Sequence, residues 1–205
     1  AKHPMSRNLA KALLIHYAVL HSEHVEANEL RYRGFGIPHD VEAILSCAPW
    51  AATLVFEGEL WQIHDFEKRA FPIPKCFRTA DNKVKGDFIM TLVYDPPLNP
   101  NYGAEYCRSN MEVSLGTYDA DATGKKKHKG KIPVDLGDFQ QKFEHYMIEH
   151  GFKWSPVKVY RKSMSGIGGD EWRLHIDLQH RADFQQESAQ RFALILSMFD
   201  RTEQL

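Results

Sequence analysis

The chain has 205 residues, 43% of them hydrophobic, which is enough for a globular core and argues against intrinsic disorder. Its 26 Lys and Arg residues nearly balance 27 Asp and Glu residues, and the resulting net charge of −1 is too small to attract nucleic acid or an acidic membrane surface. No segment approaches the ~20 consecutive apolar residues that cross a bilayer. We therefore expect a soluble protein that binds neither nucleic acid nor membrane.

The N-terminal segment predicts a buried helix. Ser6 is a good N-cap, and apolar residues then occupy almost every side from Leu9 to Leu20, interrupted by Lys11 and His16. These two polar residues, and the lack of a small-residue cleavage site after them, argue against a secretory signal peptide. A helix that is apolar all round needs neighbours on two sides. The side chains expected to contact a partner or a missing core are Leu13, Leu14 and Tyr17.

Beyond Pro49 the sequence changes to the two-residue period of strands. The predicted strands are Ala52–Phe56, Leu60–Ile63, Asp87–Tyr94, Met111–Tyr118, Val157–Tyr160, Glu171–Leu178 and Arg191–Phe199, and one helix is predicted at Phe139–Ile148. The first two strands are expected to flank a Glu-Gly turn. Strands that follow strands, with turn residues between them, predict a mainly β fold with N-terminal helices. The strands are expected to form an antiparallel β-sandwich of jelly-roll or fibronectin-like type.

Two of these strands are expected to be central. Asp87–Tyr94 is rich in β-branched and aromatic residues, and Arg191–Phe199 is almost entirely apolar. Alternate residues of a central strand face the core between the two sheets. The side chains expected to be most buried are Phe88, Met90, Leu92, Phe192, Leu194 and Leu196.

Three loops attract functional interpretations. The proline-rich segment Asp95–Gly103 is expected to be rigid. It either presents Tyr102, Glu105 and Arg108 to a partner or is a structural crossover between the sheets, and the sequence favours neither. The basic run Lys125–Lys131 lies in a predicted loop from about 119 to 134 and, lacking interleaved aromatic residues, is expected to be a solvated hairpin tip. Gly166–Gly169 precedes a strand, so we expect a hairpin turn there and no phosphate site.

Histidine and cysteine spacing predicts no metal site and no cofactor. His16, His21 and His24 are separated by five and three positions, so only the last two share a helix face. These histidines are expected to be exposed to water. The cysteines Cys47, Cys76 and Cys107 form no Cys-x-x-Cys pair, which favours free thiols in a reducing cytosol.

Several blocks of the chain resemble a known family. The helical stretch Ser6–Ala18, the turn Gly34–Pro38 and the run Val41–Leu45 are similar to the end of the catalytic core of subtilisin-like serine proteases. Leu92–Asn110 and Gly151–Tyr160 resemble the C-terminal region of a bacterial group of these subtilases, which is typically encoded beside an AAA-type ATPase.

The resemblance implies that residues 1–49 are the last helices of a truncated α/β subtilase core and that residues 50–205 form an accessory β-sandwich. The family's catalytic motifs, a strand-end Asp, a His-Gly-Thr run and a Gly-Thr-Ser-x-Ala run, do not occur in the chain. Gly116-Thr117 is followed by Tyr118, so it is not the nucleophile motif. The resemblance therefore assigns no catalytic residue here.

In the parent enzyme a Ser-His-Asp triad would hydrolyse peptide bonds. This chain would support the missing N-terminal core, recruit a protein substrate or contact the ATPase, in the cytoplasm. The alternative is a stand-alone β-sandwich module that binds protein or carbohydrate, for which Trp50, Trp61 or Trp154 would line one loop surface.

Overall fold

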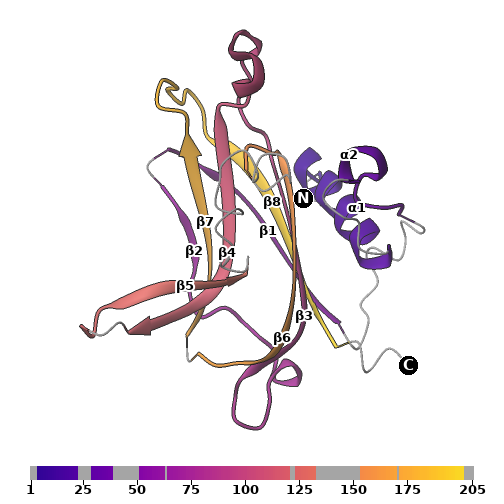
Figure 1. Cartoon of the computed structure of the whole chain (residues 1–205), viewed down its shortest axis with the longest axis vertical. Coiled ribbons are helices and arrows are strands. Elements are labelled where there is room, and N and C mark those ends of the chain that lie inside the picture. Colours follow the sequence, from indigo (N-terminus) through magenta and orange to yellow (C-terminus); the bar gives the residue numbers. More distant parts are fainter. Residues whose placement is uncertain are drawn as a thin grey trace.

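The computed structural model describes residues 4–22, 29–38, 51–62, 64–120, 123–132, 153–169 and 171–200. In these residues the chain forms two helices, two short 3₁₀ turns and two four-stranded sheets that face each other (Figure 1). The elements are α1 (Arg7–His21), α2 (Leu30–Arg33), β1 (Ala51–Leu60), β2 (Phe66–Lys68), η2 (Lys75–Phe77), β3 (Val84–Tyr94), η3 (Pro100–Glu105), β4 (Ser109–Ala120), β5 (Lys126–Ile132), β6 (Val157–Ile167), β7 (Trp172–His180) and β8 (Gln190–Phe199).

The strands pair in a nested pattern. The first sheet has the order β1-β8-β3-β6 and the second has the order β2-β7-β4-β5, and all described pairs are antiparallel. Strand β1 thus pairs with β8, β2 with β7, β3 with β6 and β4 with β5. This is the pairing of one long two-stranded ribbon folded over on itself. The predicted mainly β fold and its antiparallel sandwich are confirmed.

The core lies between the two sheets. All six side chains predicted to be the most buried belong to it and are at most 2% exposed. The second sheet contributes a matching set from alternate positions, namely Met111, Val113, Leu115, Trp172, Leu174 and Ile176. Strand β8 lies between β1 and β3, so the prediction that it is central is confirmed.

Helix α1 covers the outer face of the first sheet, over β3 and β8 (Figure 1). Ser6 caps it by accepting a hydrogen bond from the backbone N–H of Leu9 at 3.0 Å. Ala12 packs on residues such as Val93 and Ile195, which point away from the inter-sheet core. Strand β8 is therefore apolar on both faces because one face meets the other sheet and the opposite face meets α1.

Strand β1 differs from the prediction of two strands around a Glu-Gly turn. Residues Ala51–Leu60 form one continuous strand, in which Gly58 pairs with Phe192. The Phe192 ring fills the space beside this glycine, and a Cβ there would lie 3.0 Å from it. Gly58 thus admits an aromatic ring from β8 and makes no turn. Residue Ile63 lies outside the described residues.

Two loop predictions also need correction. Gly166–Gly169 makes no hairpin, because it connects β6 of the first sheet to β7 of the second. Most of the basic run is a strand and not a hairpin tip, because Lys126–Ile132 pairs with β4 as β5. Its lysines are largely exposed, so the sequence shows no alternation of apolar and polar residues there, although backbone pairing with β4 holds the segment as a strand. The predicted helix Phe139–Ile148 lies outside the described residues.

No helix in the described part of the chain combines the length and apolar character needed to span a bilayer.

Candidate functional site

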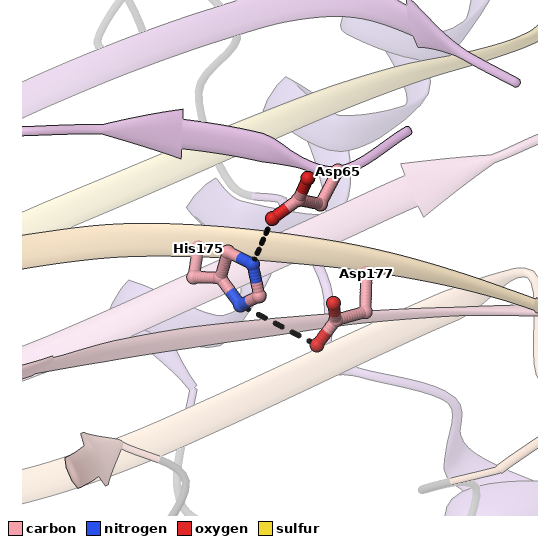
Figure 2. Close-up of side chains that lie close together, drawn as sticks. All are labelled: Asp65, His175 and Asp177. Carbon is pink, nitrogen blue, oxygen red and sulfur yellow. Dashed lines mark hydrogen bonds and ion pairs between the residues drawn. The ribbon is translucent and has the colours of Figure 1, made fainter. Parts of the chain in front are cut away.

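The outer face of the second sheet carries a cluster of ionisable side chains. On β7, Leu174 and Ile176 point into the core, so the alternating residues His175 and Asp177 point outward. Asp65 lies directly before β2, the edge strand that pairs with β7. The Nε2 atom of His175 is 2.6 Å from Asp65 Oδ2, and its Nδ1 atom is 3.4 Å from Asp177 Oδ2 (Figure 2).

A second polar group surrounds this cluster. Arg173 lies two residues before His175 on β7. Its Nη1 atom is 2.8 Å from Glu67 Oε1, and its Nη2 atom is 2.6 Å from Glu171 Oε1. The guanidinium also lies 3.7 Å from the centre of the Tyr118 ring. Residue His128 on β5 lies beside His175, with 5.8 Å between the ring centres. The outer face thus presents a continuous polar stripe across β2, β7, β4 and β5.

The electrostatics differ on the two sides of His175. Its hydrogen bond holds the pKa of Asp65 below the usual range, whereas burial raises the pKa of Asp177. Burial lowers the pKa of His128, and the neighbouring His175 adds to that effect. The cluster therefore joins the edge strand β2 to β7 through a charged pair that depends on the protonation of His175.

The same three residues could ligate a metal. Asp65, His175 and Asp177 each offer one ligand atom, and these atoms lie within 4.8 Å of one another. The two ring nitrogens of His175 face different carboxylates, however. A metal bound at one nitrogen would leave the other carboxylate to accept the opposite N–H, an orienting role rather than ligation. The arrangement therefore supplies two ligands and one orienting group.

A serine and a histidine also meet nearby without forming a catalytic pair. Ser114 Oγ lies 3.1 Å from His128 Nε2. In a serine protease a carboxylate on Nδ1 fixes the tautomer of the histidine. Here His128 Nδ1 is buried and has no hydrogen-bond partner. The pair lacks the third member of a triad.

Replacing His175 by Asn is expected to raise the pKa of Asp65 toward its ordinary value, because the hydrogen bond from His175 is the main cause of its lowering. NMR titration of the Asp65 carboxyl measures this change directly. His180→Asn is the matched control, since His180 ends the same strand and has its own contacts with Gln190 and Phe184. An unchanged Asp65 titration in His175→Asn would contradict the pairing.

The proline-rich segment connects the two sheets. It leads through η3 from β3 of the first sheet to β4 of the second, as the crossover interpretation predicted. Arg108 is buried, its guanidinium lies 3.8 Å from the centre of the Tyr102 ring, and it pairs with Asp183. Tyr102 and Glu105 are exposed. Of the three predicted contact residues, therefore, only these two present their side chains at the surface.

The three predicted contact residues of α1 have different environments. Tyr17 is buried within the chain, Leu13 is half-buried, and Leu14 is 43% exposed. The helix therefore buries one face in the sandwich and leaves part of its apolar surface outside. Exposed apolar side chains also occur near it in sequence, at Met5, Tyr32 and Ile37.

The expectation that His16 is exposed to water is wrong. His16 is 3% exposed, with Nδ1 2.8 Å from Thr91 Oγ1 and Nε2 2.8 Å from Ser197 Oγ. Ser197 Oγ in turn lies 2.7 Å from Thr53 Oγ1. This network joins α1 to three strands of the first sheet. Burial, with a smaller contribution from Arg161, lowers the pKa of His16 to about 3. His21 is exposed, and His24 lies outside the described residues.

The structure describes two of the three tryptophans named for the binding-module alternative. Trp61 follows β1 and Trp154 precedes β6, and these are the two edge strands of the first sheet. Trp154 is half-buried, with the Arg181 guanidinium 3.7 Å from the centre of its ring. Trp50 lies outside the described residues.

The structure describes two of the three cysteines, and Cys47 lies outside the described residues. Cys76 and Cys107 are free thiols, exposed and buried respectively.

Sequence reasoning missed the cluster around His175, although part of its signal was local. The His-x-Asp spacing of His175 and Asp177 on a predicted strand places both side chains on one face. Their partner Asp65 is 110 positions from His175, a separation that no local pattern spans.

The chain was compared with models of protein families and with curated proteins, and neither comparison gives a match.

Proposed function

We propose that this chain is the C-terminal accessory region of a bacterial, cytoplasmic subtilisin-like serine endopeptidase, as its resemblance to that family implies. Its sandwich would be a jelly roll, the type that the nested pairing of the eight described strands supports best. The chain itself would not hydrolyse peptides, because the family motifs that supply the nucleophile and base are absent from its sequence.

The two-sided environment of α1 carries the proposal. One face of the helix is fixed to the sandwich, where Asn8 donates to Asp95 at 3.0 Å and to the Arg191 carbonyl at 3.1 Å. Leu14 on the same helix is 43% exposed, so part of its side chain remains in water. Full burial of such a side chain is worth about 1.5–3 kcal/mol. A helix shared between the sandwich and a protease core would gain the part of that burial which Leu14 still lacks, somewhat under half of it.

In this arrangement α1 would contact both the sandwich and the protease core and so fix their relative positions. The polar network of His16 fixes the orientation of the helix on the first sheet, so the core would be held at a defined place beside it. The exposed residues Tyr102 and Glu105, at the end of the sandwich, then remain available for a protein substrate or the associated ATPase.

The test compares this chain with the product of its complete reading frame. Upstream of Ala1 the frame is expected to encode the Asp, His-Gly-Thr and Gly-Thr-Ser-x-Ala motifs. A fluorophosphonate probe is expected to label one serine of the longer product and none in this chain. Stoichiometric labelling of a serine in this chain, or a longer frame without those motifs, would contradict the proposal.

The same experiment tests the role of α1. Leu14→Lys in the longer product is expected to lower the labelling rate or the thermal midpoint of the protease core, because the lysine charge would be buried at the contact. In the isolated chain the same variant should change stability by less than about 1 kcal/mol, since Leu14 is already exposed. Lys11→Ala, an exposed change on the same helix, is the matched control.

A further inference from the structure

A lysine, an asparagine and a glutamate meet where β4 and β6 begin. Lys158 is 1% exposed and Asn110 is 0% exposed, so both side chains are removed from water. Lys158 Nζ donates a hydrogen bond to Asn110 Oδ1 at 2.6 Å. Asn110 Nδ2 donates to Glu112 Oε1 at 2.7 Å. The backbone N–H of Trp154 donates to the same Asn110 Oδ1 at 2.9 Å.

A buried lysine of this kind needs an explanation. Removing an ammonium group from water costs several kcal/mol, and proteins usually compensate by pairing it directly with a carboxylate. Among the described residues, the hydrogen-bond partner of Lys158 is the side-chain amide of Asn110. Burial also lowers the pKa of Lys158 to about 8, which makes the neutral, nucleophilic amine accessible near neutral pH.

We propose that Lys158 and Asn110 form an intramolecular isopeptide bond, with Glu112 as the proton carrier. The lone pair of Lys158 Nζ attacks Cγ of Asn110, so the Nζ–Cγ bond forms and the carbonyl oxygen takes up negative charge. Glu112 accepts a proton from Nζ and donates one to Nδ2. The Cγ–Nδ2 bond then breaks, and one ammonia leaves. An amine and a primary amide are thereby converted into a secondary amide and ammonia, with no oxidant or cofactor.

The contacts of Asn110 place several of the groups that this reaction needs. The backbone N–H of Trp154 is aimed at the oxygen on which charge develops, which is the role of an oxyanion donor. Glu112 already contacts the nitrogen that must leave. The fold holds the amine against the amide, so the reaction is intramolecular and avoids the entropic cost of an encounter. Burial of Lys158 and Asn110 also limits hydrolysis of the product.

The product would join the two sheets covalently. Asn110 belongs to β4 of the second sheet, and Lys158 belongs to β6, an edge strand of the first. The described backbone pairing attaches β6 to β3 alone, so the bond would fix this edge strand to the opposite layer. Such a cross-link needs neither a thiol nor an oxidising compartment.

Intact-mass measurement tests the proposal. The purified, folded wild-type chain is expected to weigh about 17 Da less than its sequence requires, which is the mass of one ammonia. A tryptic digest is expected to yield a branched peptide containing both Asn110 and Lys158, with no cleavage after Lys158. A full-sequence mass with normal cleavage after Lys158 would overturn the proposal.

Variants identify the groups that react. Lys158→Arg and Asn110→Ala are expected to restore the full sequence mass, because each removes one partner of the bond. Glu112→Gln keeps the shape of the side chain and is also expected to show the full mass. Lys162→Arg is the matched control on the same strand and should retain the loss. A Glu112→Gln variant that is cross-linked as fast as the wild type would overturn the role of Glu112. The wild-type digest decides the proposal even where a variant fails to fold.

Discussion

Truncation of Leu194 to Ala is expected to lower the free energy of unfolding by about 2–5 kcal/mol, among the largest effects of any single substitution in this fold. Leu194 is fully buried on the central strand β8 and is paired with Phe56 on one side and Leu92 on the other. The smaller side chain would leave a cavity in the layer where the two sheets meet. Urea denaturation followed by circular dichroism measures the change.

Val55→Ala provides the control for this truncation. Val55 is on the neighbouring strand β1 and is 47% exposed, so its loss should change stability by only about 0.5 kcal/mol. A Leu194→Ala effect as small as that of the control would mean that the core does not pass through β8.

Acidification is expected to destabilise the fold through His16. Its pKa is about 3 in the folded chain and about 6.5 in a free histidine, so between these values the unfolded chain binds the additional proton. The contribution of neutral His16 is fully present above about pH 6.5 and decreases by about 1.4 kcal/mol for each pH unit below it. From pH 7 to pH 5 we expect a loss of about 2 kcal/mol from this residue.

The difference between two variants isolates this contribution from that of the carboxylates. In His16→Gln the dependence of unfolding free energy on pH should become flatter by the stated amount, whatever the absolute stability of the variant. His21→Gln should follow the wild type, since His21 is exposed on the same helix. Parallel curves for wild type and His16→Gln between pH 7 and 5 would contradict the burial of a neutral imidazole.

The sequence predicted the strands that are buried on both faces. Residues of β3 and β8 are apolar because they face the core on one side and α1 on the other, so composition alone revealed them. Strand β5 was missed because it is held by backbone pairing with β4 while its side chains, mostly lysine, face water. The turn expected at Gly58 was wrong because the glycine accommodates a ring from a strand more than a hundred residues away.

The polar sites escaped sequence analysis for a related reason. A histidine in an apolar helix gives no indication of its partners, and the partners of His16 lie 75 and 181 positions away. Lys158 and Asn110 are 48 positions apart and on different sheets. Only the short spacings, such as Asn110 to Glu112, are visible along a strand. A site whose residues come from several strands can therefore be predicted only when the pairing and register of those strands are known.

The position of β8 between β1 and β3 also determines when this fold can be completed. The first sheet has no centre until residues 190–199 have been synthesised, since β1 and β3 do not pair with each other. Until then both strands have unpaired edges and exposed apolar faces, which are the features that promote aggregation. Contacts between residues so distant in sequence also form slowly, because loop closure precedes their stabilisation. The nascent chain is therefore especially prone to misassembly just before β8 emerges.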